Sequence, residues 1–509
     1  MNKAPRSLPG STLVEGGSLS RRHLLAGAGG LAVAAASGLL PGSMRAEAAS
    51  FSGKRVVVAV GSFMSSGISM FKDEWEKQTG GTIDIVEIPF GDLYQRLFAA
   101  FTSGADQFDI AIYASNWIPE FAQAGHVIPL EPYYSQKENW NDVLPTVQRI
   151  MYSQGKRYTV PLDGDIIIGY YRKDALENAE YQKRFHEKYG YDLTSPATWA
   201  QYRDIAEFFT GWDWAASGKP GFGVLEAQKP KDVGAYILNA RAATYAANPT
   251  IKGSFFFDPD TMEPQVGNPG WVQALKDWTE IRKFGPPEMA TYGGGEMRGN
   301  FIAGDYALGI DWADVGIMAQ DENSSVIKGK IGYFVLPGPT KVWNLKSNSW
   351  QDLGKPNSAP FQGWGGWHGS VVKTSKVPDA AWSFLDFIDS TPNALKAVTT
   401  PGTARNPYRA DHFANPQAWA NSPVKYADPK PYLSTIEAAL SDPNAQSDLR
   451  IPQSGRYYEV LDQWIQEALA GSLTPEAAMK KVADQWASIT KDAGVDNQRK
   501  LYRDLYGLT

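Results

Sequence analysis

The 509-residue chain contains no cysteine and only five histidines. Without cysteine there are no disulfides and no thiol nucleophile, so stability must come from packed hydrophobic cores. The histidines are scattered along the chain without the spacing of metal ligands, so we expect no zinc site. No Gly-x-Ser-x-Gly elbow opens a helix either. These absences argue against the common hydrolase and metalloenzyme classes.

An excess of positive charge is also lacking. The chain carries 49 Lys and Arg against 55 Asp and Glu, a net charge of −6. Residues 1–48 hold five of the basic and two of the acidic residues, so the remainder has 44 basic and 53 acidic residues, a net charge of −9. Nucleic acids and anionic membranes both require a basic face. We therefore expect neither as a partner.

Long apolar runs are absent except near the amino terminus. The Gly- and Ala-rich run Leu24–Leu40 follows Arg21-Arg22 and precedes Ala46-Glu47-Ala48. This pattern predicts that residues 1–48 form a twin-arginine signal peptide with a small-residue cleavage site. The alternative is a membrane anchor, although the run is short for a span. We expect a periplasmic protein that is free and soluble, because no amino-terminal cysteine is available for lipidation.

Aromatic residues, by contrast, are abundant. All 17 Trp lie beyond residue 48, and together with 24 Tyr and 22 Phe they make up 12% of the sequence. They have two explanations: the packing of a large core, or a cleft lined by flat rings on which sugars stack. The exported part is too long for one core, so we expect two lobes.

The segment beyond residue 50 alternates between strand and helix patterns. Strands are expected at Arg55–Val60, Thr82–Ile88 and Phe108–Tyr113, with apolar residues at helical spacing between them. This order predicts an α/β lobe with a mostly parallel sheet. Ligands meet such sheets at the loops that follow the strands, here Ser62–Met64 and Ser115–Trp117. Farther on, we expect residues 338–366, rich in Gly, Pro, Asn and Trp, to form a long loop.

Six short motifs occur in a fixed order between residues 108 and 478. They are Phe108–Tyr113 with Phe121–Gly125 and Ile128–Leu130, Pro161 with Gly169–Asp174, Thr198-Trp199 with Tyr202, Phe301 with Gly304, Ala307 and Trp312, Gly363–Trp367 with Asp379–Ile388, and Gly471 with Thr474–Glu476 and Ala478. In this order the chain resembles the extracellular solute-binding proteins of ATP-driven importers. The resemblance is to their carbohydrate-binding family, which includes maltose-binding protein.

The resemblance implies an α/β, two-lobed periplasmic binding protein fold, each lobe having a mostly parallel sheet flanked by helices. The amino-terminal lobe would comprise residues 49–161 and 311–368, and the carboxy-terminal lobe residues 162–310 and 369–509. Hinge crossings would lie near Val160–Leu162, Gly309–Asp311 and Trp367–Ser370. Residues 339–360 look like an insertion, and 403–455 is longer than in compact members, which leaves the ligand size open.

The function that the resemblance implies is capture of a sugar or polyol between the lobes and delivery to the membrane permease of an ABC importer. It implies a monomer that is not an enzyme and uses no metal or cofactor. The ligand-binding candidates, carried over by position, are Tyr113, Asn116, Trp117, Asp163, Asp165, Asp311, Trp312, Asp314, Trp364, Trp367, Arg405 and Tyr457. Asp163 and Asp165 are the best of these, because acidic groups suit a polyhydroxylated or a cationic ligand.

Two alternatives stay open at this point. The paired carboxylates Asp163/Asp165 or Asp311/Asp314 also suit a secreted glycoside-processing enzyme, since sequence does not show the distance between carboxyls. The excess of acidic over basic residues also suits a receptor for a cationic solute such as a polyamine. For Trp312 and Trp367 the alternative role is packing at the hinge, and His368 is expected to be structural.

Overall fold

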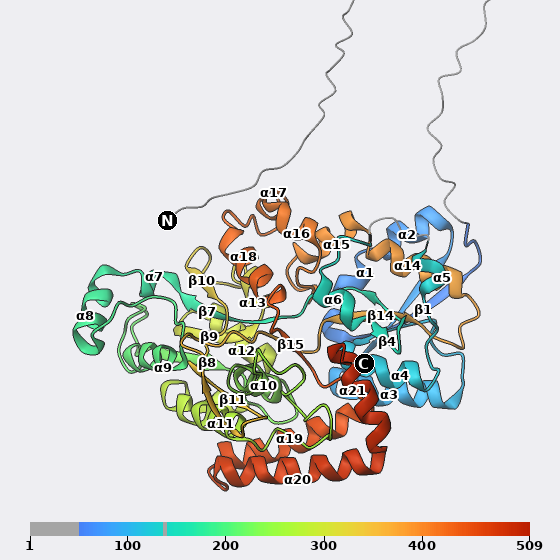
Figure 1. The fold of residues 1–509 in the computed structure, drawn as a ribbon. Helices are drawn as coiled ribbons and strands as arrows, with labels where there is room; N and C mark the ends of the chain where they lie inside the picture. Colours follow the sequence, from blue (N-terminus) through green and yellow to red (C-terminus); the bar gives the residue numbers. More distant parts are fainter. Residues whose placement is uncertain (1–49, 136–139, 509) are drawn as a thin grey trace, which may run out of the picture. The chain divides into compact units, whose positions relative to one another are not determined.

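The computed structural model describes residues 50–135 and 140–508. The predicted signal peptide, residues 1–48, lies outside them. The described chain contains two large β-sheets, each packed into its own hydrophobic core, and two smaller two-stranded sheets (Figure 1). No helix in these ranges combines the length and the hydropathy that crossing a membrane requires.

The first sheet has the strand order β2-β1-β3-β14-β6. β1, β2 and β3 are parallel, whereas β14 runs antiparallel to β3 and β6. Its strands are β1 (Arg55–Gly61), β2 (Thr82–Ile88), β3 (Ile110–Ala114), β6 (Val160–Pro161) and β14 (Trp367–Val371). The helical elements and the hairpin near it are η1 (Ser62–Met64), α1 (Ser66–Ser69), α2 (Lys72–Thr79), α3 (Phe90–Ser103), η2 (Ser115–Trp117), α4 (Ile118–Gln123), α5 (Glu131–Tyr134), α6 (Pro145–Ile150), β4 (Tyr152–Ser153), β5 (Lys156–Arg157), α14 (Pro378–Ile388) and α15 (Thr391–Val398).

The second sheet has the order β15-β13-β7-β9-β8, with β10 also paired to β7. Its strands are β7 (Ile167–Arg172), β8 (Phe222–Glu226), β9 (Tyr306–Trp312), β10 (Ile331–Phe334), β13 (Phe361–Gln362) and β15 (Gln446–Ser447). β7 is antiparallel to β9, β10 and β13, so this sheet is mixed. The expectation of mostly parallel strands therefore describes β1–β3 and is wrong for the second sheet.

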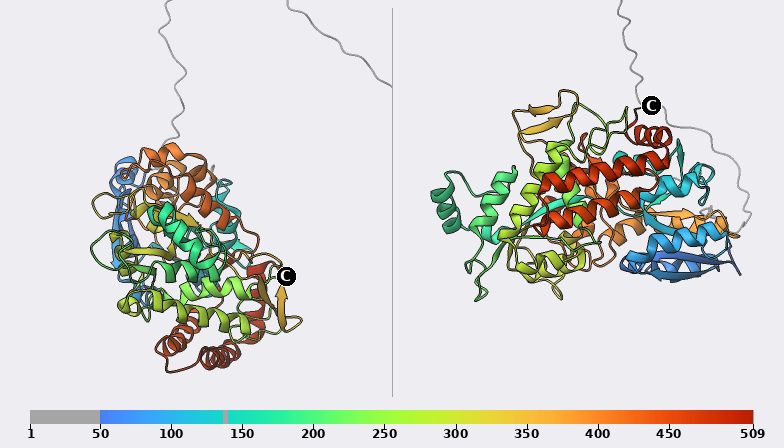
Figure 2. Two further views of the ribbon diagram at one scale, coloured as in Figure 1. Left: turned by 90° about the vertical axis from the view of Figure 1, so that its left-hand side faces the viewer. Right: turned by 90° about the horizontal axis from the view of Figure 1, so that it is seen from below.

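Helices surround the second sheet. They are α7 (Lys173–Leu176), α8 (Ala179–Tyr189), α9 (Trp199–Phe208), α10 (Gly234–Ala246), α11 (Pro269–Ile281), η3 (Arg282–Phe284), η4 (Pro287–Thr291), α12 (Gly294–Ala303), α13 (Asp314–Met318), α16 (Ala410–Ala414), α17 (Pro416–Ala420), α18 (Lys430–Leu440), α19 (Ser454–Leu469), α20 (Pro475–Ala493) and α21 (Val495–Tyr506). α10 is buried on nearly all sides, which fits its lack of a polar face. The long helices α19 and α20 lie side by side (Figure 2).

The chain passes between the two sheets at three places: residues 162–166 join β6 to β7, residues 363–366 join β13 to β14, and residues 399–409 follow α15. The crossing predicted at Gly309–Asp311 is wrong, because β9 pairs with β7 on one side and β8 on the other. The predicted lobe boundaries also differ from the sheets. β10 and β13, predicted for the amino-terminal lobe, lie in the second sheet, and α14, predicted for the carboxy-terminal lobe, packs on the first core.

Residues 338–366 are not one long loop as expected. They contain the hairpin β11 (Lys341–Asn344) and β12 (Ser349–Asp352), followed by β13. The hairpin lies against α10, and just beyond that helix the Asn248 amide donates to the Gln351 side chain at 3.0 Å. The predicted insertion is therefore a small sheet that covers the second core.

Candidate functional site

Four aspartates meet beside the crossing at residues 162–166. Asp163 and Asp165 lie on the crossing, Asp311 ends β9, and Asp314 begins α13. The antiparallel register of β7 on β9 pairs Ile167 with Trp312, so the residues just before β7 lie alongside the end of β9. All four aspartates are buried. With Arg298 and Asn406 they form what we call the aspartate cluster.

Arg298, on α12, neutralises the β9 side of the cluster. Its Nε donates to Asp311 Oδ2 at 2.7 Å, and its Nη2 lies 3.3 Å from Asp314 Oδ2. Burial alone lowers the pKa of Arg298, but Asp311 and Asp314 raise that pKa more, so the guanidinium stays protonated. Burial also raises the pKa of Asp311, and Arg298 opposes that shift.

Asn406 organises the other two carboxyls. Its backbone N–H donates to Asp163 Oδ1 at 2.5 Å, and its side-chain amide donates to Asp165 Oδ1 at 3.0 Å. Burial raises the pKa of both aspartates, and the charge of Asp163 further raises that of Asp165. Both carboxyls therefore favour the neutral, protonated form more than an exposed aspartate does.

A line of aromatic rings connects the two cores next to this cluster. Trp364 lies 5.3 Å from Phe90 and 5.1 Å from Tyr236, measured between ring centroids, and Tyr236 stacks on Tyr458 at 4.8 Å. Phe90 begins α3 of the first core, whereas Tyr236 and Tyr458 lie on α10 and α19 of the second. We call these four residues the aromatic row. Phe90, Trp364 and Tyr236 are only partly buried, so the row reaches the surface.

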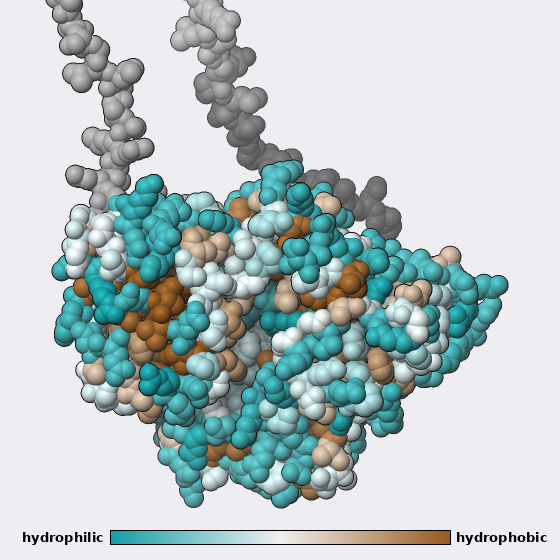
Figure 3. Space-filling model, turned by 180° about the vertical axis from the view of Figure 1, so that it is seen from behind, coloured by the Kyte–Doolittle hydropathy of each residue, from teal (hydrophilic) through white to brown (hydrophobic). Residues whose placement is uncertain are grey.

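The row and the cluster meet through Trp312, whose ring stacks on Trp364 at 4.6 Å. Trp312 also donates from Nε1 to the Gly363 carbonyl at 2.9 Å. The aspartate cluster thus lies one indole ring away from the partly exposed Trp364. On the face drawn in Figure 3, a patch of hydrophobic residues borders a hollow on the side of the first sheet.

The turn that carries Trp364 requires glycine at its next two positions. Gly365 and Gly366 have φ of +60° and +84°, and a Cβ there would lie 2.2 Å from Ser115 Oγ and 2.2 Å from the Asp163 carbonyl, respectively. Trp364 itself has a φ of +61°, a strained conformation for a residue with a side chain. The Trp364 N–H donates to Asp448 Oδ2 at 2.5 Å, and the Ser115 hydroxyl donates to its carbonyl at 2.7 Å. These two hydrogen bonds hold the strained backbone of Trp364, and with it the indole ring, in place.

Asp448 also fixes the other end of the row. The Tyr458 hydroxyl donates to Asp448 Oδ1 at 2.8 Å, and Asn239 Nδ2 donates to the Tyr458 hydroxyl at 3.0 Å. Burial raises the pKa of Asp448 to about 8, although these donors and Arg450 oppose the shift. The buried carboxyl of Asp448 therefore positions both Trp364 and Tyr458.

The structure brings most of the predicted binding residues to this region. The cluster contains the four predicted aspartates, Asp163, Asp165, Asp311 and Asp314. Trp312 stacks on Trp364, and the Trp364 and Trp367 ring centroids are 5.7 Å apart. Arg405 lies against the crossing, with its Nε donating to the Leu162 carbonyl at 2.5 Å. Asn116 follows Ser115, which touches the turn, and its Oδ1 has no partner among the described residues.

The other predicted residues lie elsewhere. Tyr113 is buried within the first sheet, its hydroxyl bonded to Ser370 Oγ at 2.7 Å. Trp117 packs edge-on against Tyr94 in the first core. Tyr457 lies in the second core, bonded to Thr490 and packed on Trp486, and does not join the cluster or the row. His368 is buried between Thr159 and the Gly365 carbonyl, and burial lowers its pKa to about 3, so it stays neutral.

Sequence reasoning missed Arg298, Asn406, Tyr236, Asp448 and Tyr458. One of these had a usable signal, because Tyr457, Leu461 and Ile465 recur every four residues and so mark the core face of α19. That stripe assigns Tyr457 to the core and leaves Tyr458 on a neighbouring face. Nothing in the sequence connects Arg298 to Asp311. Across residues 50–135 and 140–508, no group of three or more His, Asp or Glu residues is placed to hold a metal ion.

This geometry agrees with comparisons to known proteins. A family model described as bacterial extracellular solute-binding protein matches residues 61–394. The chain belongs to this family. This solute-binding protein is 27% identical over 331 residues to a probable ABC transporter-binding protein of Deinococcus radiodurans, and the match covers 62% of this chain and 67% of that one.

Two further similarities are informative. The solute-binding protein is 23% identical over 323 residues to a mannitol-binding protein of Pseudomonas aeruginosa, covering 62% of this chain and 64% of that one. It thus spans about two thirds of the length of the curated relatives it matches. A ribitol-bound crystal structure of an ABC transporter solute-binding protein from Agrobacterium radiobacter K84 has a TM-score of 0.69 at 18% identity, covering 86% of this chain and 100% of that one. The predicted two-lobed α/β fold is confirmed.

Proposed function

We propose that the protein is the receptor of an ABC importer and binds a sugar or polyol between its two lobes. The observation that carries this proposal is the position of Trp364, whose partly exposed ring touches rings from both cores and stacks on the tryptophan beside the aspartate cluster. A ligand at Trp364 would contact both lobes, which is how a binding event becomes lobe closure. The names of the mannitol-binding relative and the ribitol-bound neighbour support a polyol or sugar as ligand.

The chemistry of the region suits such a ligand. Sugars and polyols present C–H faces to aromatic rings and hydroxyl groups to carboxyl and amide groups. The aromatic row supplies the first kind of contact. Asn116, whose Oδ1 has no partner in the described chain, and the other polar groups around the turn supply the second, and their fixed positions limit the cost of ordering the site.

The remaining parts of the proposal concern location and assembly. We propose export by the twin-arginine route, supported by Arg21-Arg22 and the apolar run that follows, and residence in the periplasm as a monomer. The membrane permease of the importer is the protein partner. The family's description as extracellular fits an exported protein.

The two alternatives fit the cluster less well. A glycosidase needs two carboxyls about 5 Å or more apart across the scissile bond. Asp163 and Asp165 instead both accept hydrogen bonds from Asn406, and Asp311 and Asp314 both bind Arg298. A polyamine receptor needs unpaired negative charge, whereas Arg298 pairs with two of the carboxyls here and burial raises the pKa of the other two.

Binding is tested by calorimetric titration of the purified protein with ribitol, D-mannitol, maltose and putrescine. We expect binding of at least one sugar or polyol and none of putrescine. Trp364→Ala should weaken that binding at least about tenfold, the equivalent of one lost ring contact. Trp350→Ala is the matched control, because Trp350 lies exposed on the β12 strand and should leave affinity unchanged.

Two results would overturn the proposal. One is binding of putrescine in preference to every sugar and polyol tested. The other is equal affinity in Trp364→Ala and Trp350→Ala, which would place the ligand away from the aromatic row. Release of a cleaved sugar during the titration would favour the enzyme instead.

A further inference from the structure

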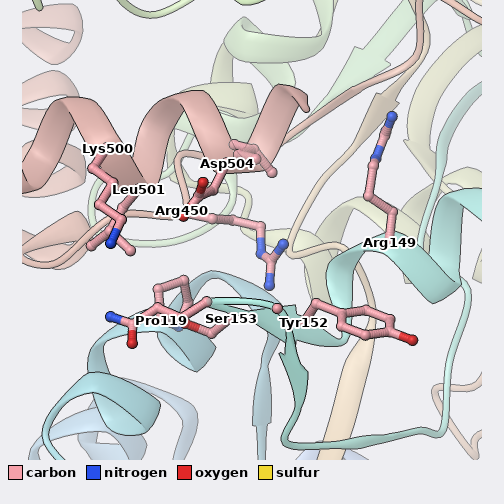
Figure 4. A pocket seen from close by; sticks show the side chains of 11 residues that line it. Pro119, Arg149, Tyr152, Ser153, Arg450, Lys500, Leu501 and Asp504 are labelled. Carbon is pink, nitrogen blue, oxygen red and sulfur yellow. The ribbon is translucent and has the colours of Figure 1, made fainter. Parts of the chain in front are cut away.

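A cavity lies between elements of the two cores, and its lining includes no residue of the aspartate cluster or the aromatic row. It has a volume of about 560 Å³. One wall consists of Pro119 on α4, Arg149 on α6 and the β4–β5 hairpin, and the other of Arg450 and α21 (Figure 4). We call it the cationic cavity.

Three cationic side chains line this cavity: Arg149, Arg450 and Lys500. The carboxylate on its wall is Asp504. None of the three cations forms an ion pair with any residue of the described chain. An arginine as buried as Arg450, at 3% exposure, normally has a carboxylate partner, because an unpaired buried charge is costly.

The hydrogen bonds of Arg450 leave its guanidinium without a negatively charged partner. Nε donates to the Ser115 carbonyl at 3.1 Å, and Nη2 donates to the Ile150 carbonyl. Both acceptors are neutral carbonyls, and Nη1 donates to no described residue. Figure 4 shows the guanidinium between α21 and the hairpin, facing the space that Lys500 also borders. Burial, together with the charge of Arg149, lowers the pKa of Arg450 to about 9.

The other two cations extend the positive charge of this cavity. Arg149 and Lys500 are exposed residues on its wall. A phosphate or similar oxyanion accepts several hydrogen bonds at once and is bound most strongly by arginine. The cavity therefore offers such an ion a buried guanidinium and two flexible cations.

We propose that the cationic cavity binds a small anion that carries a phosphate-like dianionic group. Three positive groups and one carboxylate leave an excess of two positive charges, which a dianion neutralises. The volume exceeds that of a bare phosphate ion and falls in the usual range of ligand sites. Pro119, Leu501 and Leu505 add apolar wall for an organic part of the ligand. The site is separate from the proposed sugar site.

The test is calorimetric titration with inorganic phosphate and, separately, with glycerol 3-phosphate, at constant ionic strength in chloride. Direct titration is needed because phosphate also stabilises proteins by exclusion from their surface. We expect saturable one-to-one binding of at least one of the two anions, weakened at least about tenfold in the double variant Arg149→Gln/Lys500→Gln. Binding of glycerol 3-phosphate alone would assign the cavity to organic phosphates.

The matched control is Lys183→Gln/Lys480→Gln, which removes the same charge from two lysines in surface pairs on α8 and α20. It should bind the anion as the unchanged protein does. Equal weakening in both double variants would reduce the effect to net charge and overturn the proposal, as would no saturable binding of either anion. Sugar binding provides an independent measure of folding, since neither double variant touches the aromatic row.

Discussion

The aspartate cluster and the cationic cavity both lie where the two cores meet, and they differ in how their buried charged groups are partnered. In the cluster, four carboxyls find partners within the protein: Arg298 for two of them and Asn406 for the others. In the cavity, Arg450 receives only neutral carbonyls, and Arg149 and Lys500 form no ion pair in the described chain.

The cluster is therefore a pre-formed scaffold, whereas the cavity is a site whose charges lack partners. A charge that is paired internally rigidifies its surroundings and has little left to offer a ligand. A buried charge with weak partners is stabilised when a ligand supplies the missing one. We therefore expect the cluster to affect mainly stability and the geometry of the aromatic row, and the cavity to respond mainly to anions.

The largest effect should come from removing the cation of the cluster. Arg298→Met leaves Asp311 and Asp314 buried without their partner, and we expect a loss of about 3–5 kcal/mol in the free energy of unfolding. Urea denaturation measures it. Lys183→Met, which breaks an exposed pair with Glu187, should cost about 0–1 kcal/mol. Similar losses in both variants would contradict an internally paired cluster.

Asp448 should give the protein a pH-dependent stability. Its pKa is about 8 in the folded protein, against an ordinary value of 3.8, so the folded state retains a proton that the unfolded state has lost. Between about pH 4 and pH 8 the free energy of unfolding should fall as the pH rises, by up to about 1 kcal/mol per pH unit.

The variant Asp448→Asn isolates this contribution. It loses one hydrogen bond at every pH, so the informative quantity is the difference between variant and unchanged protein as a function of pH. Relative to the unchanged protein, we expect the variant to become more stable from pH 4 to pH 8 in urea titrations. A difference that stays constant over this range would show that Asp448 is ionised throughout.

Arg450→Lys tests the bridging role of the cavity arginine with its charge retained. A lysine cannot reach the Ser115 and Ile150 carbonyls in the same geometry, so we expect a loss of about 1–3 kcal/mol in the free energy of unfolding. Denaturation in chloride buffer gives the value. If stability were unchanged, the two carbonyl bonds would contribute little to holding the cores together.

The smallest effect should be that of Arg149→Gln/Lys500→Gln without an added anion. Both residues are exposed and without ion pairs in the described chain, so each change should alter stability by at most about 0.5 kcal/mol. Loss of Arg149 also removes repulsion from Arg450. A large destabilisation in chloride would mean that the cavity cations are structural, as those of the cluster are.

Much of the first lobe follows from local pattern. The predicted strands Arg55–Val60, Thr82–Ile88 and Phe108–Tyr113 correspond to β1, β2 and β3, because a run of apolar residues that is buried on both faces has few other solutions. The second lobe was harder to predict. The family resemblance placed a hinge crossing at the end of β9, but the position of this strand is set by pairing with β7 and β8, which lie far away in sequence.

The candidate site divides in the same way. Asp163, Asp165, Asp311, Asp314, Trp312 and Trp364 were predicted from motif position, and the structure places them together. Arg298 and Asn406, which decide the protonation of those aspartates, gave no signal, since an ion pair across 13 residues or a bond across 241 residues depends on the folded path. Tyr457 was chosen in place of Tyr458, an error of one position on a helix, which rotates a side chain by about 100°.

The sequence alone determined the family, the two-lobed α/β architecture and the residue types available for a ligand, because these depend on periodicity and on the order of short motifs. The tertiary structure decided which strand lies in which sheet, which carboxyls pair with Arg298, and that Trp364 joins rings from both cores. It also decided that three cations meet in one cavity without a carboxylate paired to any of them. These properties depend on distances between residues far apart in the chain, and only the packed structure fixes such distances.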